Sequence, residues 1–160
     1  MADTKIRTRK ATSILKEDHR KVKKLFAEFD KLEESDTAEM ARIFEIVKKE
    51  ITAHAEIEEE IFYPAVQKAE DDEAEELIRE AREEHRLVKM LIEEISGITA
   101  DDEQFCAKMK VLKDMVLHHA EEEEKEIFPV FEDLDKEEQD RISEQLHARK
   151  QEITPEEEED

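Results

Sequence analysis

One segment of eleven residues occurs twice in this chain, at positions 54–64 and 119–129. Each copy begins with His-Ala-Glu, has a glutamate four positions after the histidine, and has a proline ten positions after it. A second pair of similar segments, 17–23 and 83–89, lies upstream of them, and each carries a single histidine. The two copies of the eleven-residue segment are 65 residues apart, and the histidines of the second pair are 66 residues apart. The chain therefore contains an internal repeat of helix–helix units.

The repeated histidines and glutamates fall on the apolar stripes of four helical segments. Side chains four positions apart share one face of a helix, so His54 points with Glu58, and His119 points with Glu123. Apolar residues recur on the same faces at steps of three and four, which predicts one core-facing stripe per helix. The stripes are Leu15-His19-Val22-Phe26-Phe29, Ile43-Val47-Ile51-His54-Glu58-Ile61-Ala65, Ile78-Ala81-His85-Val88-Ile92-Ile95 and Phe105-Met109-Leu112-Val116-His119-Glu123-Ile127-Val130.

Four histidines and two glutamates on core-facing stripes need partners inside the protein. Each buried polar group without one costs on the order of a few kcal/mol, and a metal centre would supply the partner. Imidazole and carboxylate together suit zinc, manganese or iron. We assign one ion to His19 and His54, a second to His85 and His119, and Glu58 and Glu123 as residues that could bridge them. Six side chains cannot saturate two six-coordinate ions, so positions would stay open for water, oxygen, peroxide or nitric oxide. The alternative is a set of purely structural histidines, which the repeated spacing disfavours.

The composition predicts an all-α protein, because 46% of the residues are charged and only one of the 160 is glycine. We expect an up-down-up-down four-helix bundle with a short fifth C-terminal helix and a disordered acidic tail. The helices are expected from Thr12 or Ser13 to about Glu34, from Thr37 through a bend at Pro64 to about Glu70, from Asp71-Asp72 to Ser96 with Gly97 as C-cap, from Asp101-Asp102 past Pro129, and from Asp135 to about Gln151. The expected domains are a flexible N-terminus at 1–11, the bundle at 12–150 and the acidic tail at 151–160.

The formal net charge of −22 disfavours nucleic acid and anionic membranes as partners. Cys106 is the only cysteine, so neither an intramolecular disulfide nor a thiolate metal cluster is expected. No stretch of the sequence has the length and apolar character of a membrane span or a secretory signal, and we expect a cytoplasmic protein. A single glycine also argues against a nucleotide-binding loop, and no nucleophile triad is apparent.

Several other polar residues are interpreted as surface or packing groups. His118 is adjacent to His119 but about 100° away around the helix, so a surface position is favoured over a role beside the metals. Tyr63, the only tyrosine, could reach the centre, but packing at a helix end is favoured. His147 lies outside the repeat and is interpreted as a chance match to a metal-binding pattern. The remaining glutamates near the repeated motif are expected to form a solvated face, namely Glu59, Glu60, Glu121, Glu122 and Glu124.

The pattern of His19, His54-x-x-x-Glu58, His85 and His119-x-x-x-Glu123 resembles the cation-binding pattern of hemerythrin-like domains. The similarity covers about residues 12–132 and includes the Ile-Phe-Tyr-Pro and Ile-Phe-Pro endings of the two long segments. It implies a four-helix bundle that holds two iron ions, rather than manganese or zinc, with bridging carboxylates and a bridging oxygen. The four histidines would be terminal ligands, and Glu58 and Glu123 would be the bridges.

The sequence differs from the oxygen-carrying members of that family, which have two histidines four residues apart on the third helix. Here the residues four positions from His85 are Ala81 and Lys89, so one ligand is missing. The resemblance therefore implies a protein that binds or reacts with hydrogen peroxide, oxygen or nitric oxide, acting as a monomer or weak homodimer. Two alternatives remain: an iron or oxygen sensor or carrier without turnover, and a metal-free structural bundle.

Overall fold

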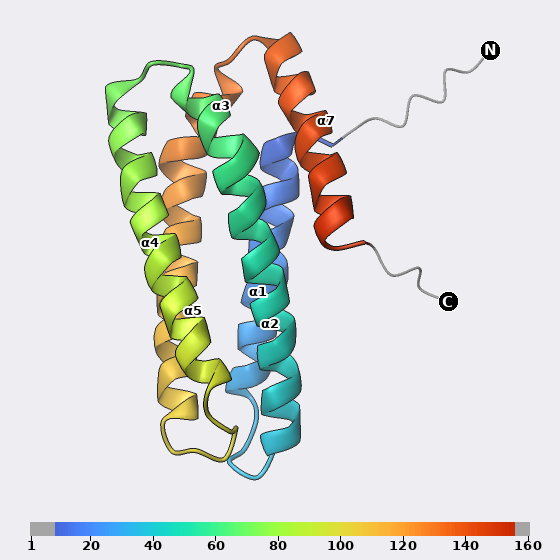
Figure 1. The fold of residues 1–160 in the computed structure, drawn as a ribbon, viewed down its shortest axis with the longest axis vertical. Coiled ribbons are helices and arrows are strands. Elements are labelled where there is room, and N and C mark those ends of the chain that lie inside the picture. Colours follow the sequence, from blue (N-terminus) through green and yellow to red (C-terminus); the bar gives the residue numbers. More distant parts are fainter. Residues whose placement is uncertain (1–8, 156–160) are drawn as a thin grey trace, which may run out of the picture.

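The computed structural model describes residues 9–155 as four long antiparallel rods and one additional helix (Figure 1). The elements are α1 (Ala11–Asp30), α2 (Thr37–Ile57), the π-helix η1 (Glu58–Phe62), α3 (Tyr63–Gln67), α4 (Asp72–Ser96), α5 (Phe105–Glu122), the π-helix η2 (Glu123–Ile127), α6 (Phe128–Glu132) and α7 (Lys136–Ile153). The segments α2, η1 and α3 form one continuous rod, and α5, η2 and α6 form another. Within the described residues there is no strand, so the all-α prediction is confirmed.

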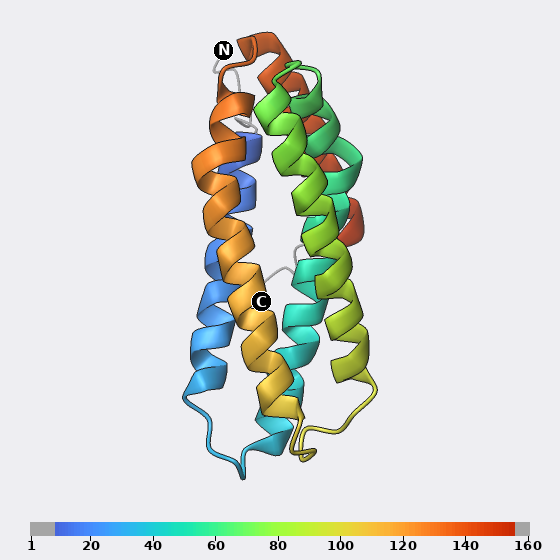
Figure 2. The same cartoon turned by 90° about the vertical axis from the view of Figure 1, so that its left-hand side faces the viewer.

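The topology is up-down-up-down, as the sequence predicts (Figure 2). The α1–α2 and α4–α5 connections lie at one end of the bundle, and the α3–α4 and α6–α7 connections lie at the other. Helix α1 contacts α2 and α5, and α4 contacts α5 and α2, which closes a ring of four helices. Helix α7 packs along the outside of α1 and α2.

Some helix boundaries follow local sequence signals. The carboxylate of Asp71 accepts a hydrogen bond from the Ala74 amide, so it caps α4 as predicted. Gly97 follows α4 as its C-cap, but its φ of −87° is right-handed and does not require glycine. The rod that begins with α2 ends near Glu70, whose φ of 53° is left-handed.

Other boundaries differ from the predictions because tertiary contacts or turns determine them. Helix α1 begins at Ala11, before the predicted caps, because Ser143 of α7 accepts a hydrogen bond from the Ala11 amide at 2.8 Å. Thr12 does not cap the helix and donates instead to Glu132. Helix α5 begins at Phe105 rather than at Asp101-Asp102, because these residues form turns in which the Asp102 side chain accepts from the Gln104 amide.

The ends of the chain are only partly described. Helix α7 extends to Ile153, so residues 151–153 of the expected tail are helical. Residues 1–8 of the expected flexible N-terminus and 156–160 of the expected acidic tail lie outside the described residues. None of the helices within 9–155 combines the length and apolar character needed to cross a membrane.

Two apolar clusters fill the bundle, and the repeated histidines lie at their boundary. The upper cluster, toward α3 and α7, includes Leu15, Ile57, Phe62, Tyr63, Ile78, Ala81, Phe128, Phe131, Ile142 and Leu146. The lower cluster includes Val22, Phe26, Ile43, Val47, Ile51, Val88, Ile92, Ile95, Phe105, Met109 and Leu112. On α1 and α4, the histidine falls between the last upper and the first lower residue, so a polar layer separates the clusters.

The two π-helices begin at the repeated glutamates. The Tyr63 amide bonds to the carbonyl of Glu58, and the Phe128 amide bonds to the carbonyl of Glu123, five residues back in each case. Each proline is the second residue after the π-helix, where its missing amide is accommodated without ending the rod. A π-helix changes the face on which all later residues fall. Beyond Glu58 the predicted stripe is therefore wrong at Ile61, which is partly exposed, and it misses Tyr63, which is fully buried, although Ala65 is buried as predicted.

Candidate metal centre

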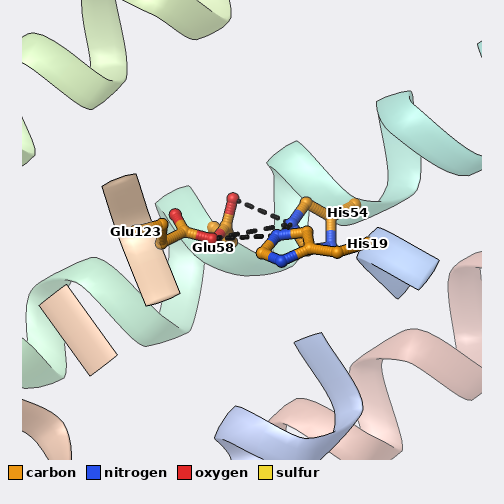
Figure 3. A group of neighbouring side chains, drawn as sticks. All are labelled: His19, His54, Glu58 and Glu123. Carbon is orange, nitrogen blue, oxygen red and sulfur yellow. Dashed lines mark hydrogen bonds and ion pairs between the residues drawn. The ribbon is translucent and has the colours of Figure 1, made fainter. Parts of the chain in front are cut away.

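The six predicted residues meet inside the bundle, in the polar layer between the two apolar clusters. They come from all four rods: His19 from α1, His54 from α2, Glu58 from η1, His85 from α4, His119 from α5 and Glu123 from η2. Glu58 and Glu123 are 0% exposed. Figure 3 shows His19 and His54 with their rings turned toward these two carboxylates.

The histidines form two pairs. In the first half-site, Nε2 of His19 lies 3.2 Å from Nε2 of His54. In the second half-site, Nε2 of His85 lies 3.2 Å from Nε2 of His119. These are the pairs that the repeat predicts.

Both glutamates lie between the half-sites. Oε1 of Glu58 is 3.2 Å from Nε2 of His54 and 3.2 Å from Nε2 of His85. The two oxygens of Glu123 contact the other histidine of each half-site, at 3.2 Å from His19 and 3.3 Å from His119. Each carboxylate therefore reaches a nitrogen in both half-sites, as a bridging group would.

Every histidine of the centre also has a carboxylate on its other nitrogen. These pairs place Nδ1 of His54 2.9 Å from Asp18, Nδ1 of His19 2.8 Å from Glu124, Nδ1 of His85 3.1 Å from Glu59, and Nδ1 of His119 3.1 Å from Glu84. Two of the partners precede His19 and His85 in the chain, and two follow Glu58 and Glu123, so they obey the internal repeat. The interpretation of Glu59 and Glu124 as merely solvated is wrong. The repeat held the signal for these partners, which sequence reasoning missed.

These outer carboxylates determine which nitrogen faces the centre. A carboxylate only accepts hydrogen bonds, so Nδ1 must carry the proton, and a neutral imidazole then keeps a lone pair on Nε2. Four Nε2 lone pairs therefore converge on two buried carboxylates. Oε2 of Glu58 and Oε1 of Glu123 accept no hydrogen bond within the described part of the chain. Such a set of donors requires cations, either protons or metal ions.

Protons can occupy the centre when metal does not. Burial disfavours a charged His54, but the charge of Glu58 and hydrogen bonds to Asp18, Glu123 and Glu58 outweigh it, so the pKa of His54 is well above its usual value. Burial likewise opposes charge on His119, yet hydrogen bonds to Glu123, Glu58 and Glu84 raise its pKa well above its usual value.

The two carboxylates respond in the opposite direction. Burial and the charge of Glu123 favour a protonated Glu58, but the charge of His54 and a hydrogen bond with His119 leave its pKa below the usual value. Burial also favours a protonated Glu123, but its contacts with Glu58 and the histidines hold its pKa well below the usual value. Carboxyl groups with lowered pKa values beside imidazoles suit the centre to cations.

Tyr63 lies at the centre, so its interpretation as a packing residue is wrong. Its hydroxyl donates to Glu123 at 2.5 Å and lies 3.3 Å from Glu58. The same oxygen is 3.4 Å from Nε2 of His85 and 3.3 Å from Nε2 of His119, both in the second half-site. Burial, followed by the charges of the two glutamates, raises the pKa of Tyr63 well above its usual value, so the phenol is neutral.

The repeat counterpart of Tyr63 has no hydroxyl. Phe128 occupies the equivalent position 65 residues later and stacks on His19 with ring centroids 5.9 Å apart. Tyr63 stacks in the same way on His85, at 5.6 Å. The two half-sites thus share their ring packing and differ in one oxygen atom.

The other polar residues singled out from the sequence stay away from the centre. The His118 side chain is 73% exposed and pairs with Glu122 at the surface, as predicted. His147 and Cys106 are exposed as well.

A cavity of about 50 Å³ lies against the histidines. Its walls include all four imidazoles, and the rest is largely aliphatic, with Val22, Ile51, Val88, Ile92 and Val116 among the lining residues. Most of these residues belong to the lower cluster, whereas Tyr63 belongs to the upper one. A molecule of a few atoms fits this space beside the imidazoles.

A buried layer of four imidazoles and two carboxylates inside a closed four-helix bundle defines a cation-binding helical domain. A comparison with known families agrees, because residues 10–131 match the hemerythrin HHE cation binding domain. The chain belongs to this family.

Individual relatives extend this assignment. A protein from Nostoc sp. described as a DNA nickase is 32% identical over 117 residues, which is 72% of this chain and 31% of that protein. An uncharacterized hemerythrin-like protein from Schizosaccharomyces pombe is 29% identical over 125 residues, covering 78% of this chain and 60% of that protein. This chain therefore spans less than two thirds of either relative.

A solved structure supports the fold. The crystal structure of a hemerythrin HHE cation binding domain-containing protein from Mycobacterium kansasii aligns with a TM-score of 0.76 at 24% identity. The alignment covers 91% of this chain and 87% of that one.

Proposed function

We propose that this protein binds two iron ions in the polar layer and uses them to bind or react with a small oxidant: hydrogen peroxide, oxygen or nitric oxide. The observation that carries the proposal is the convergence of four imidazole Nε2 atoms on two buried carboxylates, each with one oxygen that accepts no hydrogen bond from residues 9–155. His19 and His54 would hold one ion, and His85 and His119 the other. Glu58 and Glu123 would bridge them, since each contacts both half-sites.

The chain's own residues would orient the centre and control access to it. The carboxylates on Nδ1 keep every Nε2 directed inward and available as a donor. The aliphatic walls of the cavity favour a small uncharged molecule over an anion. Bound iron would supply one-electron redox chemistry.

Tyr63 would give the second half-site a function that the first lacks. A neutral phenol within 3.4 Å of both histidines of that half-site can donate a proton. It lies in the half-site whose third-helix histidine is missing, where Ala81 and Lys89 stand in the sequence. This placement favours reaction with peroxide or nitric oxide over reversible oxygen carriage.

A sensor or carrier without turnover is the second candidate, and the position of the polar layer favours it. The layer separates the upper and lower clusters, so loss of the ions would leave buried charges between them. Iron availability would then control the stability of the whole bundle.

Elemental analysis and a near-ultraviolet spectrum of the purified protein test the proposal first. We expect about two irons per chain, and His147→Ala, which alters an exposed imidazole away from the centre, should retain them. Consumption of added peroxide or nitric oxide would support turnover, whereas binding without consumption would support the sensor or carrier. Wild-type protein that takes up no ferrous iron under anaerobic conditions would refute both.

The Nostoc relative's description raises DNA cleavage as a further activity, and we propose that this chain lacks it. The chain spans 31% of that protein, and its net charge of −22 opposes contact with a phosphate backbone. Iron-loaded protein mixed with supercoiled plasmid should leave the plasmid intact, and nicking that Glu58→Gln abolishes would refute this.

A further inference from the structure

Helix α7 lies outside the region that defines the family, yet it reaches the candidate metal centre. The family match ends at residue 131, and α7 spans Lys136–Ile153. Near its end, the Lys150 ammonium donates to Oδ1 of Asp18 at 2.6 Å. The other oxygen of Asp18 accepts from Nδ1 of His54 at 2.9 Å. Three residues therefore connect α7 to the first half-site.

Asp18 depends on both of these contacts because it is buried. Only 5% of the residue is exposed, so water cannot readily replace a lost partner. The Lys150 side chain is 27% exposed, which keeps its charge close to solvent while its head contacts Asp18. Without Lys150, one oxygen of a buried carboxylate would lose the only polar partner that residues 9–155 give it.

The equivalent position of the second half-site lacks this support. Glu84 is the repeat counterpart of Asp18, and its carboxylate accepts from Nδ1 of His119. Its side chain is 30% exposed, and within 9–155 no lysine or arginine lies within 4.0 Å of it. Solvent covers this carboxylate where α7 covers the other, so Lys150 is specific to the first half-site.

Contacts other than Asp18 hold α7 in place. Arg149 forms ion pairs with Glu56 at 3.2 Å and with Glu60 at 2.9 Å, both on the α2 rod. Ile142 and Leu146 are buried in the upper cluster. Lys150 is thus presented to Asp18 by a helix whose docking does not depend on it.

We propose that Lys150 is a positioning residue of the metal centre: it fixes Asp18, and Asp18 orients His54 to bind a cation in the first half-site. The proposal rests on the metal binding proposed above, but not on any reaction of the metals. It gives α7 a role in cation binding. It also implies that residues 10–131 alone would bind a cation less tightly at the first half-site.

The sign of the effect separates positioning from simple charge. Removing a positive charge near a cation site strengthens cation binding by Coulomb's law, although the effect is screened for a partly exposed ammonium. Disturbing the partner of a metal-binding histidine weakens binding, typically by about 10- to 100-fold. Positioning therefore predicts that Lys150→Met binds metal less tightly, and a pure charge effect predicts the reverse.

The experiment compares full-length Lys150→Met, Lys150→Arg and Arg149→Met with wild type. Arg149→Met is the matched control, because it removes one positive charge and one anchor from the adjacent position of α7 without touching Asp18. Anaerobic ferrous iron titrated against a competing chelator gives the two affinities. Nitrogen-15 spectra of zinc-loaded protein report the Nδ1–H of His54 and its exchange with solvent.

We expect Lys150→Met to bind one of the two ions about tenfold more weakly and to expose the His54 Nδ1–H to exchange. Lys150→Arg should restore most of both properties, and Arg149→Met should change neither. Unchanged or tighter binding in Lys150→Met, or an equal loss in Arg149→Met, would overturn the role of Lys150 while leaving two-metal binding intact. Wild-type protein that binds neither ferrous iron nor zinc would overturn both proposals.

Discussion

The two half-sites of the centre have the same arrangement of histidines but differ in the residues that surround them. Each has two histidines with Nε2 atoms 3.2 Å apart, outer carboxylates on Nδ1, and an aromatic ring stacked on one imidazole. The second half-site has the Tyr63 hydroxyl where the first has the bare ring of Phe128. The first has Asp18 covered by Lys150, where the second has the more exposed Glu84.

We infer from this difference that the two half-sites have different roles within one symmetric bundle. A lysine contacts one outer carboxylate in each half-site, but Asp18 of the first is buried, whereas the Glu59 side chain of the second, 3.2 Å from Lys89, is 27% exposed. The second half-site also has a proton donor, Tyr63, beside it. We expect tight holding of a cation in the first and chemistry at the second.

Removing what the half-sites share should have the largest effect. Replacing Glu58 and Glu123 together with leucine deletes both buried carboxylates, so the protein should lose both ions. The metal-free double variant should lose about 3–5 kcal/mol in free energy of unfolding, because the buried imidazoles and the Tyr63 hydroxyl lose their carboxylate partners. Elemental analysis and urea denaturation measure the two results. Retention of two irons would show that the carboxylates do not connect the half-sites.

Exchanging the two aromatic residues tests the second half-site directly. Tyr63→Phe removes a hydrogen bond to the charged Glu123, so metal-free protein should lose about 1.5–3 kcal/mol in free energy of unfolding. Peroxide consumption by iron-loaded Tyr63→Phe should fall as well. Phe128→Tyr places a hydroxyl beside His19 and is the matched variant for added size. If Tyr63→Phe keeps wild-type stability and rate, the phenol has no role beyond packing.

The outer carboxylates should differ in importance. Asp18→Asn should weaken ferrous iron binding in its half-site by up to about 100-fold, and Glu84→Gln by nearer tenfold. The reason is that solvent can compensate for a lost contact at Glu84 but not at Asp18. Chelator competition measures both affinities. A larger loss in Glu84→Gln would reverse the proposed order.

The pH dependence of the metal-free protein should treat both half-sites equally, because each has one histidine with a raised pKa, His54 or His119. A raised histidine pKa stabilises the fold below about pH 6.5, and this contribution is lost as pH rises through the folded-state pKa. The lowered pKa values of Glu58 and Glu123 stabilise the fold above about pH 4.5, and that contribution is lost as pH falls.

Stability without metal should therefore be greatest between about pH 4.5 and 6.5, and should fall above that range by about 1.4 kcal/mol per pH unit for each histidine. Urea midpoints from pH 4 to 9 measure this slope. His54→Gln and His119→Gln should each remove half of it. A slope that only one of them changes would show that the half-sites already differ without metal.

The sequence predicted the fold and the inner residues of the centre because the repeat constrains both. Two copies of His-x-x-x-Glu and two single histidines lie on four helical stripes, and this pattern predicts that they meet in one polar layer. Prediction failed where regular helical periodicity ended. The π-helices turned Tyr63 inward and Ile61 partly outward, and a period of 3.6 residues cannot anticipate that change.

Long-range contacts were also beyond the reach of local patterns. Nothing near Lys150 in the sequence indicates that it meets Asp18, which is 132 residues away. Similarly, α1 begins where Ser143 accepts its first amide, and not at a local cap. Asp18, Glu59, Glu84 and Glu124 were visible as repeated positions, but acidic residues are so common here that only their location beside the imidazoles distinguishes them.

The polar layer also determines how the four helices align lengthwise. The apolar clusters are made of interchangeable Ile, Val, Leu and Phe, which would tolerate one helix sliding past another by a turn of about 5.4 Å. The layer would not, because such a slide would set imidazoles against aliphatic side chains and separate Glu58 and Glu123 from histidines that they contact on other rods. The residues that we propose to hold metal therefore also fix the lengthwise register of the four helices.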